Sequence, residues 1–301
     1  MASGEAPHEP ALKSNEILLY LHNYSFYSQK VLMALIEKGL KYRTHLVNIA
    51  NGEQYQDWFL KINPRGEVPV IQDGENIVPD SLRIINYLED KYTGESHARL
   101  IPTDESADII EKHNHFHTII HELPADVITI GSFYHTEFVR SPKLPFIYPV
   151  RRHMKTVTAK SLAKLKTLLE KGHEAGETLK LKIEFLEKLE ATIKDKEAFS
   201  KVLETVDRVL DEVEQQLWDN QGKAEMWLIC PRYTLADIGL TTLLERLNVL
   251  GLEDRYWGRT KRPCLAGYWE RARQRQSYKQ GTPSVLFHMK TLLQGITYLS
   301  L

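Results

Sequence analysis

Three short polar stretches hold the residues of this chain that are best suited to bind or activate a ligand. The first is the stretch 23–31, NYSFYSQKV, in which Ser25 lies between an apolar run and a run with helical spacing. A serine at this point can cap the helix with its hydroxyl oxygen, or it can offer the same hydroxyl to a ligand at the helix N-terminus. The residues of this turn alone leave both roles open.

The second candidate is the Val68-Pro69 pair, which stands directly before a predicted strand. Proline has no N–H, so it occurs at the start or edge of a strand, and an X-Pro bond in a tight turn can be cis. A cis bond here would turn the Val68 backbone outward and leave its N–H and C=O free to pair with an extended, peptide-like ligand. A rigid turn that binds no ligand is the other interpretation.

The third candidate, Asp80-Ser81, opens a predicted helix. Both residue types are common helix caps. The same N–H groups and the Ser81 hydroxyl can also hold a ligand carboxylate, while Asp80 can pair with a ligand ammonium group. Capping alone and ligand binding both remain open at this position.

The elements that must position these residues follow from the hydrophobic pattern. Strand formers and helical spacing alternate in the order strand, helix, strand, helix, strand, strand, helix, which is typical of a small α/β domain. A turn at Asp73-Gly74 joins the last two strands. The predicted elements lie at 17–22, 31–36, 42–49, 54–61, 68–71, 75–78 and 81–92.

The chain divides into five expected segments: a disordered lead-in at 1–15, an α/β domain at 16–92, a linker at 93–102, an all-helical domain at 103–280 and a tail at 281–301. The lead-in lacks the basic and apolar regions of a signal peptide. The charged run 178–220 would span on the order of 60 Å as one helix, so we expect a break near 193–196.

Composition excludes several classes of function. The chain has 301 residues, a net charge of −1 and 42% hydrophobic residues, as ordinary soluble proteins do. A nearly neutral chain has no overall attraction to nucleic acid, so we expect no nucleic-acid partner. Cys230 and Cys264 are its two cysteines, which argues against a secreted disulfide scaffold. No run reaches the roughly 18 apolar residues of a spanning helix, which predicts a soluble or peripheral protein.

Positive charge is concentrated near the end of the helical region. Seven basic residues lie within 259–279, with Glu270 as the one acid among them. Either they form a solvated helix face, or they bind an anionic membrane surface with the tail as an interfacial helix. These residues are Arg259, Lys261, Arg262, Arg271, Arg273, Arg275 and Lys279.

Four histidines, His113, His115, His117 and His121, lie close together in the helical region. Two of them, His117 and His121, are one helical turn apart and could chelate zinc. No HExxH motif or nearby cysteine completes a set of ligands, so we predict no metal site.

The three polar stretches and their spacing resemble the thioredoxin-like, glutathione-binding half of glutathione S-transferases. Downstream, the stretch 233–238 (YTLADI) is similar to the capping box and staple of that family, and 262–271 to its penultimate helix. The resemblance implies a thioredoxin-like α/β domain followed by an all-helical domain, a homodimer, and glutathione as a ligand rather than a permanently bound cofactor.

The same resemblance implies roles for individual residues. Ser25 would occupy the catalytic position and stabilise a glutathione thiolate. Tyr20 is an alternative donor, although a tyrosine on a strand is more often part of the core. The remaining glutathione contacts would be Val68 and Pro69 at the cysteinyl backbone, Asp80 and Ser81 at the γ-glutamyl end, and Gln54 as a weaker contact.

Closer features resemble the ganglioside-induced differentiation-associated proteins. They are the stretches 24–40, 57–59, 66–71, 74–77 and 257–263, and an inserted helical segment at about 141–196. This resemblance implies a protein on the cytosolic face of the mitochondrial outer membrane that acts in mitochondrial fission and network dynamics. Transferase activity would be weak or absent. The inserted segment would engage mitochondrial or cytoskeletal proteins.

The chain departs from that family in two respects. The family has a hydrophobic C-terminal anchor that does not occur in this sequence, and without an anchor we expect a cytoplasmic protein. Asp80 occupies the position where transferases usually have Glu. Its side chain is one methylene shorter, so we expect weaker binding of glutathione. An active cytosolic glutathione S-transferase that uses Ser25 is the alternative.

Overall fold

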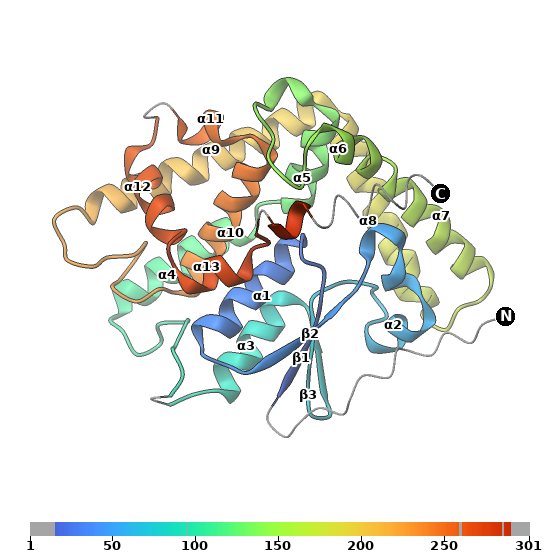
Figure 1. Cartoon of the computed structure of the whole chain (residues 1–301), viewed down its shortest axis with the longest axis horizontal. Coiled ribbons are helices and arrows are strands. Elements are labelled where there is room, and N and C mark those ends of the chain that lie inside the picture. The colour runs from blue at the N-terminus through green and yellow to red at the C-terminus, as the bar shows by residue number, and fades with distance from the viewer. Residues whose placement is uncertain (1–15, 95, 259–260, 285, 290–301) are drawn as a thin grey trace.

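A computed structural model of the chain describes residues 16–94, 96–258, 261–284 and 286–289 (Figure 1). The predicted lead-in at 1–15, Arg259 of the basic cluster and residues 290–301 of the tail lie outside the described residues. Two parts follow one another along the chain, a small sheet with its helices and a larger helical domain.

The first part has the predicted α/β order. Its sheet has the strand order β2-β1-β3-β4, with β1 parallel to β2 and antiparallel to β3. β1 is buried along its whole length, as expected of a central strand in a run of Ile and Leu. The elements are β1 (Ile17–Leu21), α1 (Phe26–Glu37), β2 (Tyr42–Leu46), η1 (Ile49–Asn51), η2 (Glu53–Tyr55), α2 (Asp57–Ile62), β3 (Val70–Asp73), β4 (Asn76–Pro79) and α3 (Ser81–Lys91).

The predicted turn between β3 and β4 is wrong by one residue. Asp73 pairs with Asn76, so the two turn residues are Gly74 and Glu75. Gly74 has φ +63°, a left-handed conformation that favours glycine. The pairing register of β3 and β4 follows from Gly74, which occupies the first of the two turn positions rather than the second.

The second part is helical, as predicted. The expected break in the charged run lies at Asp195, which ends α8 and caps α9 by accepting a hydrogen bond from the Ala198 N–H at 2.9 Å. The helices are α4 (Ala107–His121), α5 (Ala125–Tyr134), η3 (Thr136–Phe138), α6 (Tyr148–Met154), α7 (Val157–Glu170), α8 (Gly176–Lys194), α9 (Lys196–Asp219), α10 (Leu235–Leu250), α11 (Glu253–Tyr256), α12 (Pro263–Ala272) and α13 (Gln276–Gly281).

Helix α10 forms the centre of the helical core. Its N-terminus carries the expected capping box, in which the Asp237 carboxylate accepts from the Thr234 N–H at 2.9 Å. The same carboxylate accepts from the Leu228 N–H and the Tyr268 hydroxyl, so a buried charge is fully hydrogen-bonded. Both α4 and α1 pack against α10, which places the helical core directly beside the sheet domain.

Helices α7 and α8 form a hairpin that we call the lid. It lies beside α2 in the sheet domain (Figure 1). Its apolar side has its own core, which includes Leu165, Leu179 and Ile193, and Tyr55 of the sheet domain packs into that core. Lys164 of α7 donates to the Gly52 carbonyl at 2.6 Å. The lid therefore joins the sheet domain near η2.

Candidate functional site

The sheet brings the three polar stretches to one edge. Tyr20 of β1 pairs with Val70 of β3, and Val70 pairs with Pro79 of β4. The C-terminal ends of β1 and β4 and the N-terminal end of β3 therefore lie at the same edge. Ser25 follows β1, Val68-Pro69 precedes β3, and Asp80-Ser81 follows β4.

Ser25 is the N-cap of α1. Its extended backbone (φ −73°, ψ 123°) turns the hydroxyl back, and Oγ accepts a hydrogen bond from the Ser28 N–H at 3.2 Å. The cap interpretation is thus confirmed for the free protein. The hydroxyl proton is not used by this bond, so Ser25 can cap the helix and donate to a ligand at the same time.

A buried arginine that sequence reasoning missed holds the turn before Ser25. Arg246 of α10 is 5% exposed and donates from Nη2 to the Tyr24 carbonyl at 2.7 Å and from Nη1 to Thr129 Oγ1 at 3.2 Å. Burial lowers the pKa of Arg246 to about 10, an effect that the nearby Asp126 carboxylate opposes. No local pattern in the sequence marks Arg246, because its partner is distant along the chain.

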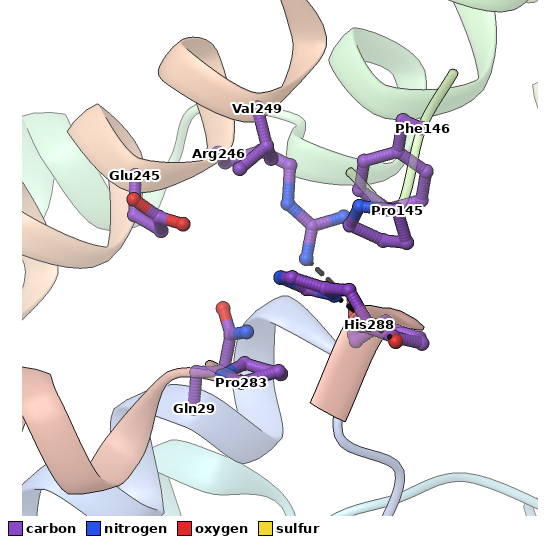
Figure 2. A pocket seen from close by; sticks show the side chains of 9 residues that line it. Gln29, Pro145, Phe146, Glu245, Arg246, Val249, Pro283 and His288 are labelled. Carbon is purple, nitrogen blue, oxygen red and sulfur yellow. Dashed lines mark hydrogen bonds between the residues drawn. The ribbon is translucent and has the colours of Figure 1, made fainter. Parts of the chain in front are cut away.

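The other side of this turn faces a pocket of about 250 Å³, a volume that includes its opening to solvent. The Arg246 guanidinium points into it toward the His288 ring, with Phe146 at the wall (Figure 2). His288 stacks on the Tyr24 ring at 5.5 Å between centroids, and the Tyr24 hydroxyl lies 3.2 Å from His288 Nδ1. Described residues of the tail therefore pack against the turn that carries Ser25.

The Val68-Pro69 bond is cis, as expected. In the described part of the chain, neither the N–H nor the C=O of Val68 makes a backbone hydrogen bond. The preceding turn is held by Asn63, whose Nδ2 donates to the Glu67 carbonyl at 2.8 Å. The geometry leaves the Val68 backbone available to a ligand; that a peptide-like ligand pairs with it stays a prediction.

Asp80 and Ser81 begin α3 at the same edge. Asp80 has φ +75°, and its Oδ1 accepts from the N–H groups of Leu82 at 3.0 Å and Arg83 at 3.1 Å. Capping is therefore confirmed for Asp80. Ser81 is buried and lines a small pocket, whereas the Asp80 side chain is exposed. Their contact with a γ-glutamyl group stays a prediction.

Of the two weaker candidates, Gln54 has a hydrogen-bond acceptor that is free within the described ranges, whereas Tyr20 is part of the core. Gln54 is buried, and its Oε1 has no hydrogen-bond partner among the described residues. Tyr20 belongs to the core, where its ring packs near Phe59 and its hydroxyl donates to Gln72 Oε1 at 3.3 Å. Tyr20 is thus a structural residue, and Gln54 keeps an unused acceptor.

The lid closes one side of the candidate site. Lys182 of α8 pairs with Glu67 at 2.5 Å, and Glu67 directly precedes Val68. The Lys182 side chain is 14% exposed and the Glu67 side chain 34% exposed, so the pair is partly shielded from water. A ligand that paired with the Val68 backbone would lie next to this ion pair.

The Tyr27 phenol lies close enough to Asp126 and Glu67 for their charges to act on its pKa. Burial raises the pKa of the Tyr27 phenol, and the carboxylates of Asp126 and Glu67 raise it further. Burial also raises the pKa of Asp126, while Lys182 and Arg246 oppose that shift. Tyr27, in the first turn of α1, is a neutral hydroxyl two residues after Ser25 that the sequence did not mark as a site residue, although it belongs to the same stretch 23–31.

The predicted basic surface is only partly available. Arg262 is buried and pairs with Asp211 at 2.7 Å, and Arg275 pairs with Glu37 of α1 at 2.6 Å. These two arginines stabilise the fold, so neither alternative for the cluster, a solvated helix face or a membrane-binding face, holds for them. The exposed members among the described residues include Arg271, Arg273 and Lys279.

Three of the four histidines, His113, His117 and His121, stack on α4, whereas His115 Nε2 lies 2.9 Å from Glu212. The rings of His113 and His117 are 5.9 Å apart, and those of His117 and His121 are 5.6 Å apart. Across the described ranges, no group of three or more His, Cys, Asp or Glu side chains is arranged to hold a metal ion. None of the helices in those ranges is both long and apolar enough to cross a membrane.

Comparison with known proteins identifies the fold and the family. The glutathione S-transferase N-terminal domain matches residues 19–96, and the C-terminal domain matches residues 184–271. Ganglioside-induced differentiation-associated protein 1-like 1 of Homo sapiens is 32% identical, over 92% of this chain and 78% of that protein. The structure of the beta-etherase LigF from Sphingobium sp. strain SYK-6 matches with a TM-score of 0.64 and 26% identity, over 88% of this chain and 98% of that one.

A further solved structure, Ure2p in complex with glutathione, has a TM-score of 0.60 and 18% identity, over 90% of this chain and 100% of that one, so it supports the fold alone. Fold and sequence together define a glutathione S-transferase-like protein, with a thioredoxin-like domain followed by an all-helical domain. Within that class, the chain belongs to the ganglioside-induced differentiation-associated protein family.

Proposed function

We propose that this protein acts in mitochondrial fission and network dynamics at the cytosolic face of the outer mitochondrial membrane, with weak or absent transferase activity. The lid carries this proposal. A plain conjugating enzyme needs an open cleft, whereas here Lys182 and Glu67 hold an additional hairpin against the candidate site. Glutathione, for which Ure2p gives a precedent, would serve as a ligand of this site rather than as a routine substrate.

The outer face of the lid is suited to a partner. Leu181 is 68% exposed and Phe185 is 48% exposed, one helical turn apart on α8. Exposed apolar side chains in one place are typical of protein interaction sites. Mitochondrial or cytoskeletal proteins would bind there, and a homodimer would form elsewhere on the molecule. Attachment to the membrane through an anchor is part of this proposal; a chain without one would act from the cytoplasm.

The test is rescue of mitochondrial morphology in cells that lack the protein. We expect the double variant Leu181→Ser, Phe185→Ser to fold normally and to leave the mitochondrial network elongated. Glu184→Ser, an exposed change between them on the same helix, is the matched control and should restore fission. Full rescue by the double variant would contradict the proposal, as would a protein that never reaches mitochondria.

The alternative is a working glutathione S-transferase. It is favoured by the meeting of Ser25, the Val68 backbone and Ser81 at one sheet edge. Ser25 would donate a hydrogen bond to the glutathione thiolate and so raise the population of the nucleophile near neutral pH. The thiolate would then form a bond to carbon and expel the leaving group from an electrophile.

Conjugation of glutathione to a generic aryl halide separates the two proposals. We expect turnover close to the uncatalysed rate for the wild type. Ser25→Gly removes the hydroxyl while costing the helix cap only a few tenths of a kcal/mol, and Ser28→Ala is the matched control at a neighbouring serine. Strong turnover that is lost in Ser25→Gly and kept in Ser28→Ala, at unchanged Tm, would establish the enzyme.

A further inference from the structure

The lid contacts the segment 49–68, which leads from β2 to the edge of the sheet where the three polar stretches meet, here called the ligand edge. Lys164 of α7 donates to the Gly52 carbonyl at 2.6 Å, near the start of the segment. Near its middle, Tyr55 is 4% exposed and packs into the core of the lid. A Cβ added at Gly66 would lie 2.7 Å from the Tyr55 ring, so the ring also lies directly against the last turn of the segment.

That last turn sets the direction of the Val68 backbone. Gly66 has φ +59°, and its N–H donates to the Asn63 carbonyl at 2.9 Å. Asn63 Nδ2 donates to the Glu67 carbonyl at 2.8 Å. Val68 follows directly, and in the described ranges its N–H and C=O make no backbone hydrogen bond of their own. Whatever holds this turn therefore also holds the groups that a ligand would meet.

Two cations share the Glu67 carboxylate, and they have different effects. Its Oε2 lies 2.9 Å from Arg65 Nε, which belongs to the same turn. Its Oε1 lies 2.5 Å from Nζ of Lys182, which is 115 residues further along the chain. The Arg65 pair moves with the turn and cannot anchor it. The Lys182 pair joins the turn to a separate helix, so it fixes the turn in space.

The contacts that anchor the segment come from the added hairpin. Lys164 and Lys182 lie between the two stretches, 19–96 and 184–271, that match glutathione S-transferase domains. The ligand edge lies within the first of these stretches. An element outside both matches thus supplies charged contacts to the turn before Val68.

Lys182 also connects the turn to the outer face of the lid. Its Nζ lies 5.1 Å from the centroid of the Phe185 ring, and Phe185 is 48% exposed. A cation is attracted to the face of an aromatic ring, more strongly when both are withdrawn from water. A partner that covered Phe185 would also lower the local dielectric and so strengthen the pair of Lys182 with Glu67.

We propose that Lys182 is a positioning residue of the ligand edge, which acts through Glu67 to hold the Val68 backbone in place, and that Phe185 couples this hold to the outer face of the lid. The inference rests on the proposed ligand site at Val68. The coupling is reciprocal, because a ligand that fixes the turn also favours the docked lid. Ligand binding at the sheet edge therefore changes the affinity of the lid for its partner, without any conversion of the ligand.

Amide exchange of the full chain, measured by NMR without a ligand, tests the hold on the turn. We expect the Gly66 amide to exchange about fivefold faster in Lys182→Met, the effect of losing one partly exposed ion pair. Amides of β1, which report opening of the sheet, should be unchanged. Lys182→Arg keeps the charge and should restore the wild-type rate. Lys180→Met is the matched control, because Lys180 pairs with Glu177 on its own helix.

A second variant tests the connection to the outer face. Phe185→Leu keeps an apolar side chain on the lid but removes the aromatic ring beside Lys182. The Gly66 amide should exchange about twofold faster, in line with a cation–π contact at an exposed site. Added to Lys182→Met, the same substitution should have no further effect, because the ring acts through the lysine.

Calorimetric titration with glutathione separates this inference from the proposed ligand. We expect the wild type and Lys182→Arg to bind glutathione alike, and Lys182→Met to bind it about fivefold more weakly. The predicted exchange pattern in a wild type that binds no glutathione would remove glutathione from the site and keep the positioning role.

The positioning role is overturned if the Gly66 amide exchanges at the same rate in Lys182→Met and the wild type. It is also overturned if these two proteins bind glutathione with equal affinity. An unchanged exchange rate in Phe185→Leu overturns the coupling to the outer face of the lid.

Discussion

Two arginines on different helices, Arg151 and Arg246, donate to backbone carbonyl groups at the junctions of the molecule. Arg246 holds the turn before Ser25. Arg151 of α6 is 2% exposed and donates to the carbonyls of Phe146 at 2.5 Å, Ser132 at 3.0 Å and Leu250 at 2.5 Å. Arginine suits this task because its planar group offers five donors in fixed directions.

Arg151→Met should destabilise the protein by about 3 kcal/mol, because three carbonyl groups would lose a charged donor in the interior. Burial lowers the pKa of Arg151 to about 10, so the wild-type group remains charged at neutral pH. Chemical denaturation measures the free energy of unfolding. The neighbouring Arg152→Met is the control, since Arg152 is exposed and should change stability little. Equal stability of the two variants would refute the role given to Arg151.

At the scale of single elements, α4 shows how a helix that looks like a metal site can serve as packing. Its histidine rings stack along one face, and burial lowers the pKa values of His113, His117 and His121. The unfolded chain binds a proton on each ring near pH 6.5, whereas the folded helix resists protonation. The folded state therefore binds fewer protons in acid, and its stability falls as the pH falls.

We expect the free energy of unfolding to decrease between pH 6.5 and about 4, the lower limit being the pKa of His117. One histidine contributes a slope of up to about 1.4 kcal/mol per pH unit within that window. His117→Phe should flatten the pH dependence measured by urea denaturation. His115→Phe, at an exposed site on the same helix outside the stack, is the comparison variant. A slope in His117→Phe equal to that of the wild type would argue against the stack as its cause.

The elements also show how far the sequence allowed prediction. Hydrophobic periodicity predicted β1, α1 and α3, and the resemblance to glutathione S-transferases then implied that Ser25, Val68 and Asp80 belong to one ligand site. The contacts of Arg246 with Tyr24 and of Lys182 with Glu67 join positions separated by 222 and 115 residues. No local pattern encodes such contacts, because they depend on how helices pack after the chain has folded.

At the scale of the whole molecule, the number of charged residues in a segment predicts its binding surface less well than the ion pairs that each charge forms. The basic residues at 259–279 predicted either a solvated helix face or a membrane face. Arg262 and Arg275 instead stabilise contacts with α9 and α1. Charge that is used for internal ion pairs is not available to lipid, so a membrane contact would depend on the exposed remainder of the cluster.

The hydrogen bond from Arg246 to the Tyr24 carbonyl also bears on how the molecule loses its structure. It joins the first strand-to-helix turn to the centre of the helical core, and the pairing of Arg275 with Glu37 joins the other end of α1 to α13. Neither part can open at α1 without breaking a buried contact of the other. The two parts therefore belong to one cooperative unfolding unit, although each resembles a separate domain. A substitution that destabilises the helical core should consequently also destabilise the turn that carries Ser25, even when every residue of the sheet is unchanged.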